Sequence, residues 1–294
     1  MTRPSRILLD SAEFEALATR LAARVAPRAA DPARVLAALS LVRDGRVVSA
    51  GDQPAAPALP PDAGVTRGVP APYRLTQWVE DGPGWGAVND RLELDIHGAT
   101  SMTHLDTTEH FAWDPHPGAV EPGGELLALA ATGSVARGVL IDVPGVLGRG
   151  GGSDVVELAD IHETIERTGT APRPGDVLYL RFGRSGRARS DAPLGSTALA
   201  GLSIECAEWL VDASPSMVVT DEGLDPFPSE VEGQPVPWHL LTLTVLRAPL
   251  VDRAMLGPLA AACSEAARWE FLSLVAPLAI PGASGSPVNP LAVL

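Results

Sequence analysis

Lysine is missing from this sequence of 294 residues, because all 22 basic residues are arginine. The absence excludes a Schiff-base lysine, a phosphate-loop lysine and a lysine general base. The basic residues are also outnumbered by 36 acidic ones, which gives a formal net charge of −14. Because a surface of that sign repels a phosphate backbone, we expect no nucleic-acid partner.

Cysteine is scarce, and long hydrophobic runs are lacking. Cys206 and Cys263 lie far apart without a CxxC pair, so we expect neither a disulfide framework nor a thiolate zinc cluster. No apolar run approaches the length that spans a membrane, and charged residues interrupt the first 17 residues where a secretory signal would lie. The sequence therefore predicts a cytoplasmic protein without membrane contact. Its 46% hydrophobic content is enough for a substantial core.

Predicted helices and strands alternate along the chain. Helical spacing between residues 11 and 41 predicts two helices, the first capped by Ser11, and a proline-rich extended connection follows at residues 54–71. Apolar and acidic residues alternate over residues 91–97, which is the period of a half-buried strand. Further strands are predicted at 138–143, 176–182 and 217–220, and further helices at 158–168, 203–211, 239–246 and 256–269. Residues 270–276 form a further apolar run. This order predicts an α/β fold.

A histidine-rich run follows the strand predicted at residues 91–97. Residues 97–110 contain three of the six histidines, namely His97, His104 and His110, together with Asp106. In a strand, His104 and Asp106 point to the same side, so their imidazole and carboxylate can converge on one divalent ion. His110 is then a candidate proton donor. The alternative, from spacing alone, is a set of ordinary polar loop residues, because short patterns give frequent false positives.

Several stretches, in order, resemble the cyclase family of metal-dependent hydrolases, which includes bacterial kynurenine formamidase and isatin hydrolase. The residues Thr103-His104-Leu105-Asp106 and His110 match the second half of the family signature His-x-Gly-Thr-His-x-Asp-x-Pro-x-His. Later matches are to the motifs GVLLDVP, GDVLxxRTG, GLSxEAAEWL and GSPVNP, at residues 138–144, 175–183, 201–211 and 285–290. The resemblance covers most of the chain after about residue 30.

The resemblance implies a divalent metal, Zn or Mn, and roles for particular residues. It implies that His104 and Asp106 bind the metal and act in catalysis, and that His110 is the acid/base. It further implies that His239 is the distal histidine ligand, and that Asp252 stands where the family has a glutamate.

Some positions depart from the signature. Thr100 stands at the first histidine, Met102 at the glycine and Thr108 at the proline. Losing one imidazole weakens a site with three protein ligands. If the segment bulges, His97 can take the place of the missing ligand, so His97 and Thr100 compete for one position.

Three functions are consistent with these residues. The first is a metal-dependent hydrolase that cleaves a small cyclic or acyl amide or lactone, as an amidase, formamidase or lactonase, by metal-activated water. The second is a biosynthetic cyclase, dehydratase or isomerase with a degenerate or absent metal site. The third is a non-catalytic ligand-binding member of the family. The expected partner is a small-molecule substrate.

The family resemblance also implies a fold and an assembly. It implies a swivelling β/β/α cyclase-like fold with a single catalytic domain at residues 76–294. Residues 1–75 are predicted to form N-terminal helices and a proline-rich arm, and the assembly to be a homodimer or homotetramer.

Other residues near the predicted site receive weaker predictions. The aromatic side chains of Phe111, Trp113 and Trp238 can wall an apolar substrate pocket, although such residues more often lie in the core. The acidic residues 221–225 follow a predicted strand, where a loop of an α/β fold can border the site, but we favour a solvated turn. His116 and His162 are interpreted as surface residues.

Overall fold

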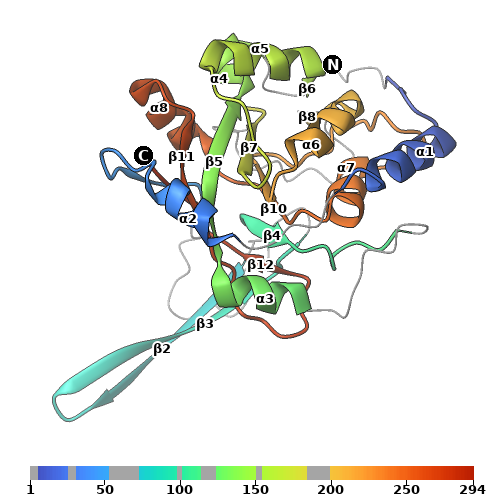
Figure 1. The fold of residues 1–294 in the computed structure, drawn as a ribbon. Coiled ribbons are helices and arrows are strands. Elements are labelled where there is room, and N and C mark those ends of the chain that lie inside the picture. Colours follow the sequence, from blue (N-terminus) through green and yellow to red (C-terminus); the bar gives the residue numbers. More distant parts are fainter. Residues whose placement is uncertain are drawn as a thin grey trace.

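A computed structural model gives the fold of the chain (Figure 1). The structure describes residues 6–25, 31–52, 73–97, 101–113, 124–149, 154–183 and 199–294. The extended connection predicted at residues 54–71 lies outside these ranges.

A nine-stranded mixed sheet forms the centre of the molecule, in the order β1-β13-β11-β5-β7-β9-β10-β4-β12. Its middle strands β5, β7, β9 and β10 are parallel, and the strands on either side of them are antiparallel to their neighbours. This mixed α/β fold confirms the predicted fold class. The strands are β1 (Val47–Ser49), β4 (His104–Asp106), β5 (Ser134–Asp142), β7 (Val177–Arg181), β9 (Met217–Thr220), β10 (Leu250–Asp252), β11 (Glu270–Val275), β12 (Gly285–Pro287) and β13 (Leu291–Val293).

Both faces of the middle strands are buried, which explains their nearly continuous apolar sequences. Ile141 and Leu180 face one core, where they pack with residues of helices α1, α5 and α6. Leu140, Tyr179 and Val219 are paired neighbours that face a second core, which α3 and α8 help to form. Alternate residues of one strand therefore belong to opposite layers, so the sheet divides the helices into two groups.

The helices follow the predicted spacing closely, although their ends differ. Asp10 caps α1: its carboxylate accepts the N–H of Glu13, and Glu13 reaches back to the N–H of Asp10. Ser11 is therefore the first helical residue and not the predicted cap, because the carboxylate one residue earlier completes a capping box. The helices are α1 (Ser11–Ala22), α2 (Pro32–Leu39), α3 (Gly124–Thr132), α4 (Val143–Leu147), α5 (Leu158–Thr168), η1 (Ile204–Cys206), α6 (Ala207–Ala213), α7 (Pro237–His239), the π-helix η2 (Leu240–Val245) and α8 (Leu256–Ala266).

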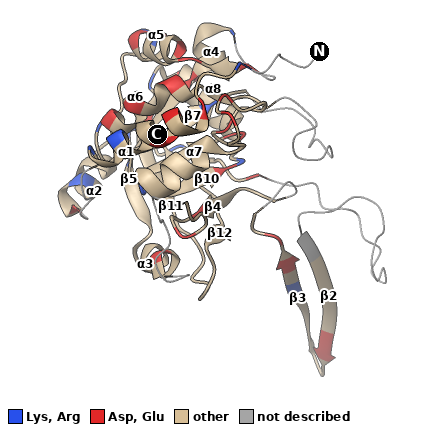
Figure 2. Ribbon diagram, turned by 90° about the vertical axis from the view of Figure 1, so that its right-hand side faces the viewer, with Lys and Arg blue, Asp and Glu red and all other residues tan. Residues whose placement is uncertain are grey.

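Two smaller sheets complete the fold. The short strands β6 (Val155–Val156) and β8 (Gly201–Leu202) pair in parallel. The strands β2 (Tyr73–Gly82) and β3 (Trp85–Leu94) form an antiparallel hairpin that stands away from the rest of the molecule in both ribbon views (Figures 1 and 2). Figure 2 also shows acidic residues on α5, α6 and the hairpin.

The hairpin corrects one prediction. The strand predicted at residues 91–97 was expected to be half-buried, yet β3 ends at Leu94 and the Leu92 side chain is 56% exposed. The alternation is real, because Leu75 pairs with Leu92 and Val79 with Val88 on one face of the ribbon. These side chains are exposed, so the apolar face of the ribbon is not buried by the described part of the chain.

No helix in the described ranges has the length and apolar character needed to cross a bilayer. Both cysteines are buried and free, as their scarcity and separation predict. Strand β1 pairs with β13 in the main sheet. The division of the chain at residue 75 stays a prediction.

Candidate metal centre

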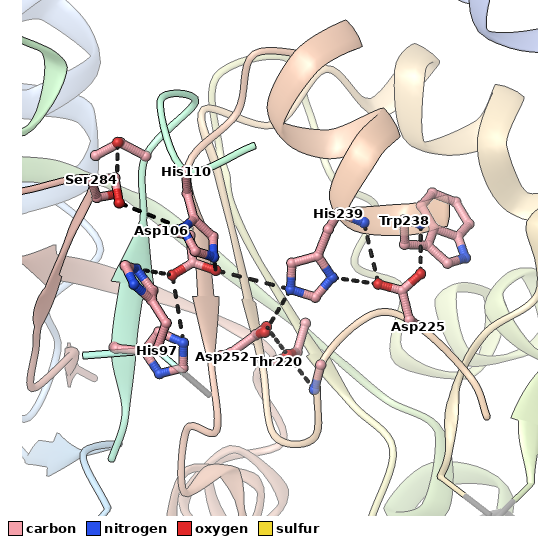
Figure 3. A network of polar contacts seen from close by, with 12 residues as sticks. His97, Asp106, His110, Thr220, Asp225, Trp238, His239, Asp252 and Ser284 are labelled. Carbon is pink, nitrogen blue, oxygen red and sulfur yellow. Dashed lines mark hydrogen bonds and ion pairs between the residues drawn. The ribbon is translucent and has the colours of Figure 1, made fainter. Parts of the chain in front are cut away.

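The histidines and carboxylates of the predicted site meet on one face of the short strand β4. His104 and Asp106 lie on β4 with Leu105 between them, and Leu105 points the other way into the apolar core. Neighbouring β10 places Asp252 directly opposite His104 in the antiparallel register. Strand pairing therefore brings together residues that lie far apart in the sequence (Figure 3).

Asp106 lies at the centre of this cluster and is almost completely buried. Its Oδ1 is 3.1 Å from His97 Nε2 and 3.5 Å from His104 Nε2. Its Oδ2 is 3.9 Å from His239 Nε2 and 4.0 Å from His110 Nε2. One carboxylate therefore faces four imidazoles, each through its Nε2 atom (Figure 3).

Two polar atoms at the centre of the cluster lack hydrogen bonds. His97 Nε2 and Asp106 Oδ1 are buried, and neither has a hydrogen-bond partner although they are only 3.1 Å apart. Buried polar atoms normally have partners. Two ligands of a tetrahedral ion with bonds near 2.0 Å are about 3.3 Å apart, so the separation is typical of atoms that share an ion. Among the residues that the structure describes, two sets of side chains have the spacing to hold an ion: His97, Asp106 and His110, and His104, Asp106 and Asp252.

The orientation of His104 is fixed by the backbone. Its Nδ1 is 2.7 Å from the carbonyl oxygen of Met102, two residues earlier. A proton on Nδ1 completes this hydrogen bond and leaves the Nε2 lone pair directed at Asp106. Metal-binding histidines commonly have their second nitrogen held in this way.

His239 lies between two carboxylates at the far side of the cluster. Its Nδ1 forms a short contact with Asp225 Oδ2, and its Nε2 is 3.1 Å from Asp252 Oδ2. Burial lowers the pKa of His239, but the charges and hydrogen bonds of Asp225 and Asp252 outweigh this effect and raise it well above the ordinary value. Burial likewise opposes ionisation of Asp252, yet the hydrogen bond and charge of His239 lower its pKa. His239 therefore bridges Asp225 and Asp252, and its two ring nitrogens each face a carboxylate.

Asp225 corrects the prediction that residues 221–225 form a solvated turn. Its side chain is mostly buried, and Oδ1 accepts the N–H of Trp238 at 2.6 Å. Its Oδ2 accepts the N–H of His239 at 3.3 Å as well as contacting the ring. Pro237 begins α7 and has no N–H, so the first N–H donors of this helix are those of Trp238 and His239. Asp225 accepts both of them and also orients the His239 ring.

His110 lies in a less polar position. Burial lowers its pKa to about 4, although the negative charge of Asp106 acts in the opposite direction. Its ring stacks on His97 with centroids 3.8 Å apart, and its Nδ1 is 3.5 Å from Ser284 Oγ. The neutral imidazole therefore predominates near pH 7, and it can accept a proton.

The aromatic residues named from the sequence do not all line the site. Phe111 contacts the rings of His110 and His239, with centroids 4.8 and 5.4 Å away. Trp113 instead stacks on Phe14, and the fully buried Trp238 donates to Leu202 O at 2.6 Å. The contacts of these two tryptophans agree with the alternative that they are core residues.

The structure brings together His97, His104, Asp106, His110, His239 and Asp252. Thr100 and His116 lie outside the described residues, while His162 is exposed on α5 as expected. The sequence analysis assigned no role in the site to Asp225, or to Thr220, whose hydroxyl donates to Asp252 Oδ1 at 3.1 Å. The position of Asp225 two residues after a buried glycine turn carries no pattern that distinguishes it from a surface acid.

Comparison with known proteins identifies the family of this chain. The sequence profile of the family described as "Putative cyclase" matches residues 48–224, which is more than half of the chain. The chain therefore belongs to the cyclase family. No curated protein matches the sequence significantly.

Solved structures share the fold. A structure described as a novel cyclase has a TM-score of 0.72 at 22% identity and covers 93% of this chain and 95% of its own. Isatin hydrolase A from Ralstonia solanacearum has a TM-score of 0.59 at 21% identity, covering 91% of this chain and 98% of that one. Isatin hydrolase A from Labrenzia aggregata, bound to benzyl benzoate, has a TM-score of 0.53 at 19% identity, covering 84% of this chain and 93% of that one. At these identities the similarity establishes the fold alone.

Proposed function

We propose that this protein is a metal-dependent hydrolase that cleaves a small cyclic or acyl amide or a lactone. The observation that carries the proposal is the pair of buried, unbonded atoms His97 Nε2 and Asp106 Oδ1, 3.1 Å apart. The mixed nitrogen and oxygen donor set around them suits Zn or Mn. Membership of the cyclase family, together with the isatin hydrolases among proteins of the same fold, supports hydrolysis.

The ligands we assign are His97, His104 and Asp106, with His239 and Asp252 completing the donor set. His97 supplies the imidazole that is missing where Thr100 replaces the first signature histidine. Its Nε2 approaches the same Asp106 oxygen that His104 faces, so the substitute comes from three residues upstream. The altered signature is therefore compatible with a complete site.

The reaction divides between the ion and the side chains around it. A bound divalent ion supplies Lewis acidity, which lowers the pKa of water and polarises a carbonyl. His110, neutral at pH 7, accepts a proton at Nε2 and returns it to the departing nitrogen or oxygen. Asp225 holds His239 in place through Nδ1, and Phe111 contributes an apolar surface beside both histidines.

Metal content and turnover test the proposal. We expect His97→Ala, His104→Ala and Asp106→Ala each to weaken metal binding by at least about 100-fold, because loss of an outer partner alone typically costs 10- to 100-fold. Bound metal is measured by mass spectrometry, and turnover on a panel of small amides, formamides and lactones. His162→Ala, a substitution of an exposed helix histidine, is the matched control. Unchanged metal content and turnover in the three site variants would contradict the proposal.

A second candidate is a cyclase, dehydratase or isomerase that works without metal. The chain Asp225–His239–Asp252 favours it, because a charged imidazole between carboxylates beside a neutral His110 can perform acid/base chemistry alone. Activity that survives complete chelation would support this candidate. Strict metal dependence would contradict it.

The assembly and the choice of ion belong to the same proposal. A homodimer or homotetramer in the cytoplasm, with Zn or Mn bound, stays a prediction.

A further inference from the structure

The turn that carries His110 is fixed on one side by Ser284, the residue before β12. The Thr107 N–H and hydroxyl both donate to the carbonyl oxygen of Ser284, at 3.0 and 2.8 Å. The His110 N–H donates to Thr107 O at 3.0 Å and closes the turn. These bonds fix the backbone at Thr107 and at His110, but they do not involve Thr108 and Glu109, which lie between them.

The other side of the turn is fixed by Glu125 in the first turn of α3. Its Oε2 accepts both the N–H and the hydroxyl of Thr108, each at 2.6 Å. In return, Glu109 Oε1 accepts the N–H of Glu125 at 3.0 Å. The loop and the helix therefore hold each other through hydrogen bonds in both directions.

Thr108 makes the bond to Glu125 necessary. The side chain is almost completely buried, and it stands where the family signature has proline. Proline fixes its own φ and has no N–H to satisfy. Threonine introduces two buried donors and a freer backbone, so the turn needs an acceptor that also holds it in place.

We propose that Glu125 is a positioning residue for His110, and that the Glu125–Thr108 pair replaces a rigid proline at this turn. Glu125 does not contact Asp106 or the histidines in any described interaction, so it acts through the backbone. It holds the His110 ring where Nε2 faces Asp106 Oδ2 at 4.0 Å. The inference rests on the proposed role of His110 as the acid/base.

Kinetics of Glu125→Ala test the inference. We expect kcat to fall about 10- to 100-fold, as a displacement of about 1 Å in a catalytic group can cause. KM and bound metal should stay unchanged, because no assigned ligand moves. Glu205→Ala is the matched control, since Glu205 Oε1 also accepts a helix N–H, that of Leu158 at 2.9 Å, which belongs to α5 and not to the turn of His110.

Two rescue variants separate positioning from general stability. Glu125→Gln keeps an oxygen acceptor and should retain most of the activity. The double variant Thr108→Pro/Glu125→Ala removes the N–H and restores the fixed φ, so it should recover much of the lost kcat. If Thr108→Pro prevents folding, the comparison of kcat between Glu125→Gln and Glu125→Ala still decides whether Glu125 positions His110.

A second measurement does not require turnover. Diethyl pyrocarbonate modifies imidazoles, and mass spectrometry maps the modification to His110. We expect faster modification of His110 in Glu125→Ala than in the wild type or Glu205→Ala, with Glu125→Gln close to the wild type. Equal kinetics and equal labelling in Glu125→Ala and Glu205→Ala would overturn the inference. If no variant hydrolyses any substrate, the proposed function fails, and the labelling still decides the role of Glu125.

Discussion

Individual residues decide whether the altered signature still makes a site. His104, Asp106 and His110 could be named from their spacing, because the strand period brings two of them to one side. His97 was an alternative to Thr100, and the contact of its Nε2 with Asp106 favours it. The role of Asp225 could not be predicted, because it depends on the contact of Asp225 with α7, which only the folded chain forms.

The two buried thiols give a prediction at the same scale. Burial raises the pKa of Cys263 from its ordinary 9.0 to about 12 and raises that of Cys206 as well. Only the thiolate reacts readily, so we expect both thiols to resist Ellman's reagent at pH 8 in the native protein and to react fully after denaturation. Absorbance at the thionitrobenzoate band measures the released equivalents.

The raised pKa of Cys263 also predicts how the free energy of unfolding depends on pH. Above pH 9 the unfolded chain releases thiol protons that the folded chain keeps, so the free energy of unfolding should fall as the pH rises from 9 toward 12. Cys263→Ala should make this decline shallower. Rapid reaction of a thiol in the native protein at pH 8 would contradict the buried, neutral state.

At the scale of elements, the sequence predicted the middle of the sheet well. The runs at residues 138–143 and 217–220 are apolar because both faces of β5 and β9 are buried, and such strands are visible in a single sequence. The hairpin β2–β3 was less visible, since alternation indicates one apolar face but does not reveal whether anything covers it. Burial is a property of the partner surface, and the sequence of one strand does not contain it.

The hairpin should be the least protected part of the described sheet structure. An isolated two-stranded hairpin is only marginally stable in water, and Val79 and Val88 are 67% and 62% exposed. We expect amides of β2 and β3 to exchange with deuterium much faster than those of β7, whose Val177–Leu180 segment is buried on both faces. Mass spectrometry of peptic peptides from both elements measures the difference.

Protein concentration provides the control for this experiment. If a second copy covers the apolar face of the hairpin, as the predicted homo-oligomer allows, protection should increase with concentration. Protection of β2–β3 equal to that of β7 at every dilution down to a monomer would contradict the expectation.

At the scale of the whole molecule, the candidate centre connects segments that the sequence separates widely. His97 follows the hairpin, His104 and Asp106 lie on β4, and His239 and Asp252 come from α7 and β10. Along the chain, these segments enclose strands β5, β7 and β9. An ion bound by them can form only in the folded chain, so its binding free energy adds to the free energy of unfolding.

Thermal unfolding should therefore depend on metal. At a free concentration 100 times the dissociation constant, a single ion adds about 2.7 kcal/mol, which raises the melting temperature by roughly 5 °C in a chain of this size. Calorimetry of the chelated protein with and without added Zn or Mn measures the shift. Asp106→Ala should lose it, because it removes the carboxylate that all four imidazoles face, whereas His162→Ala should keep it. An equal shift in Asp106→Ala would mean that the stabilising ion binds elsewhere in the molecule.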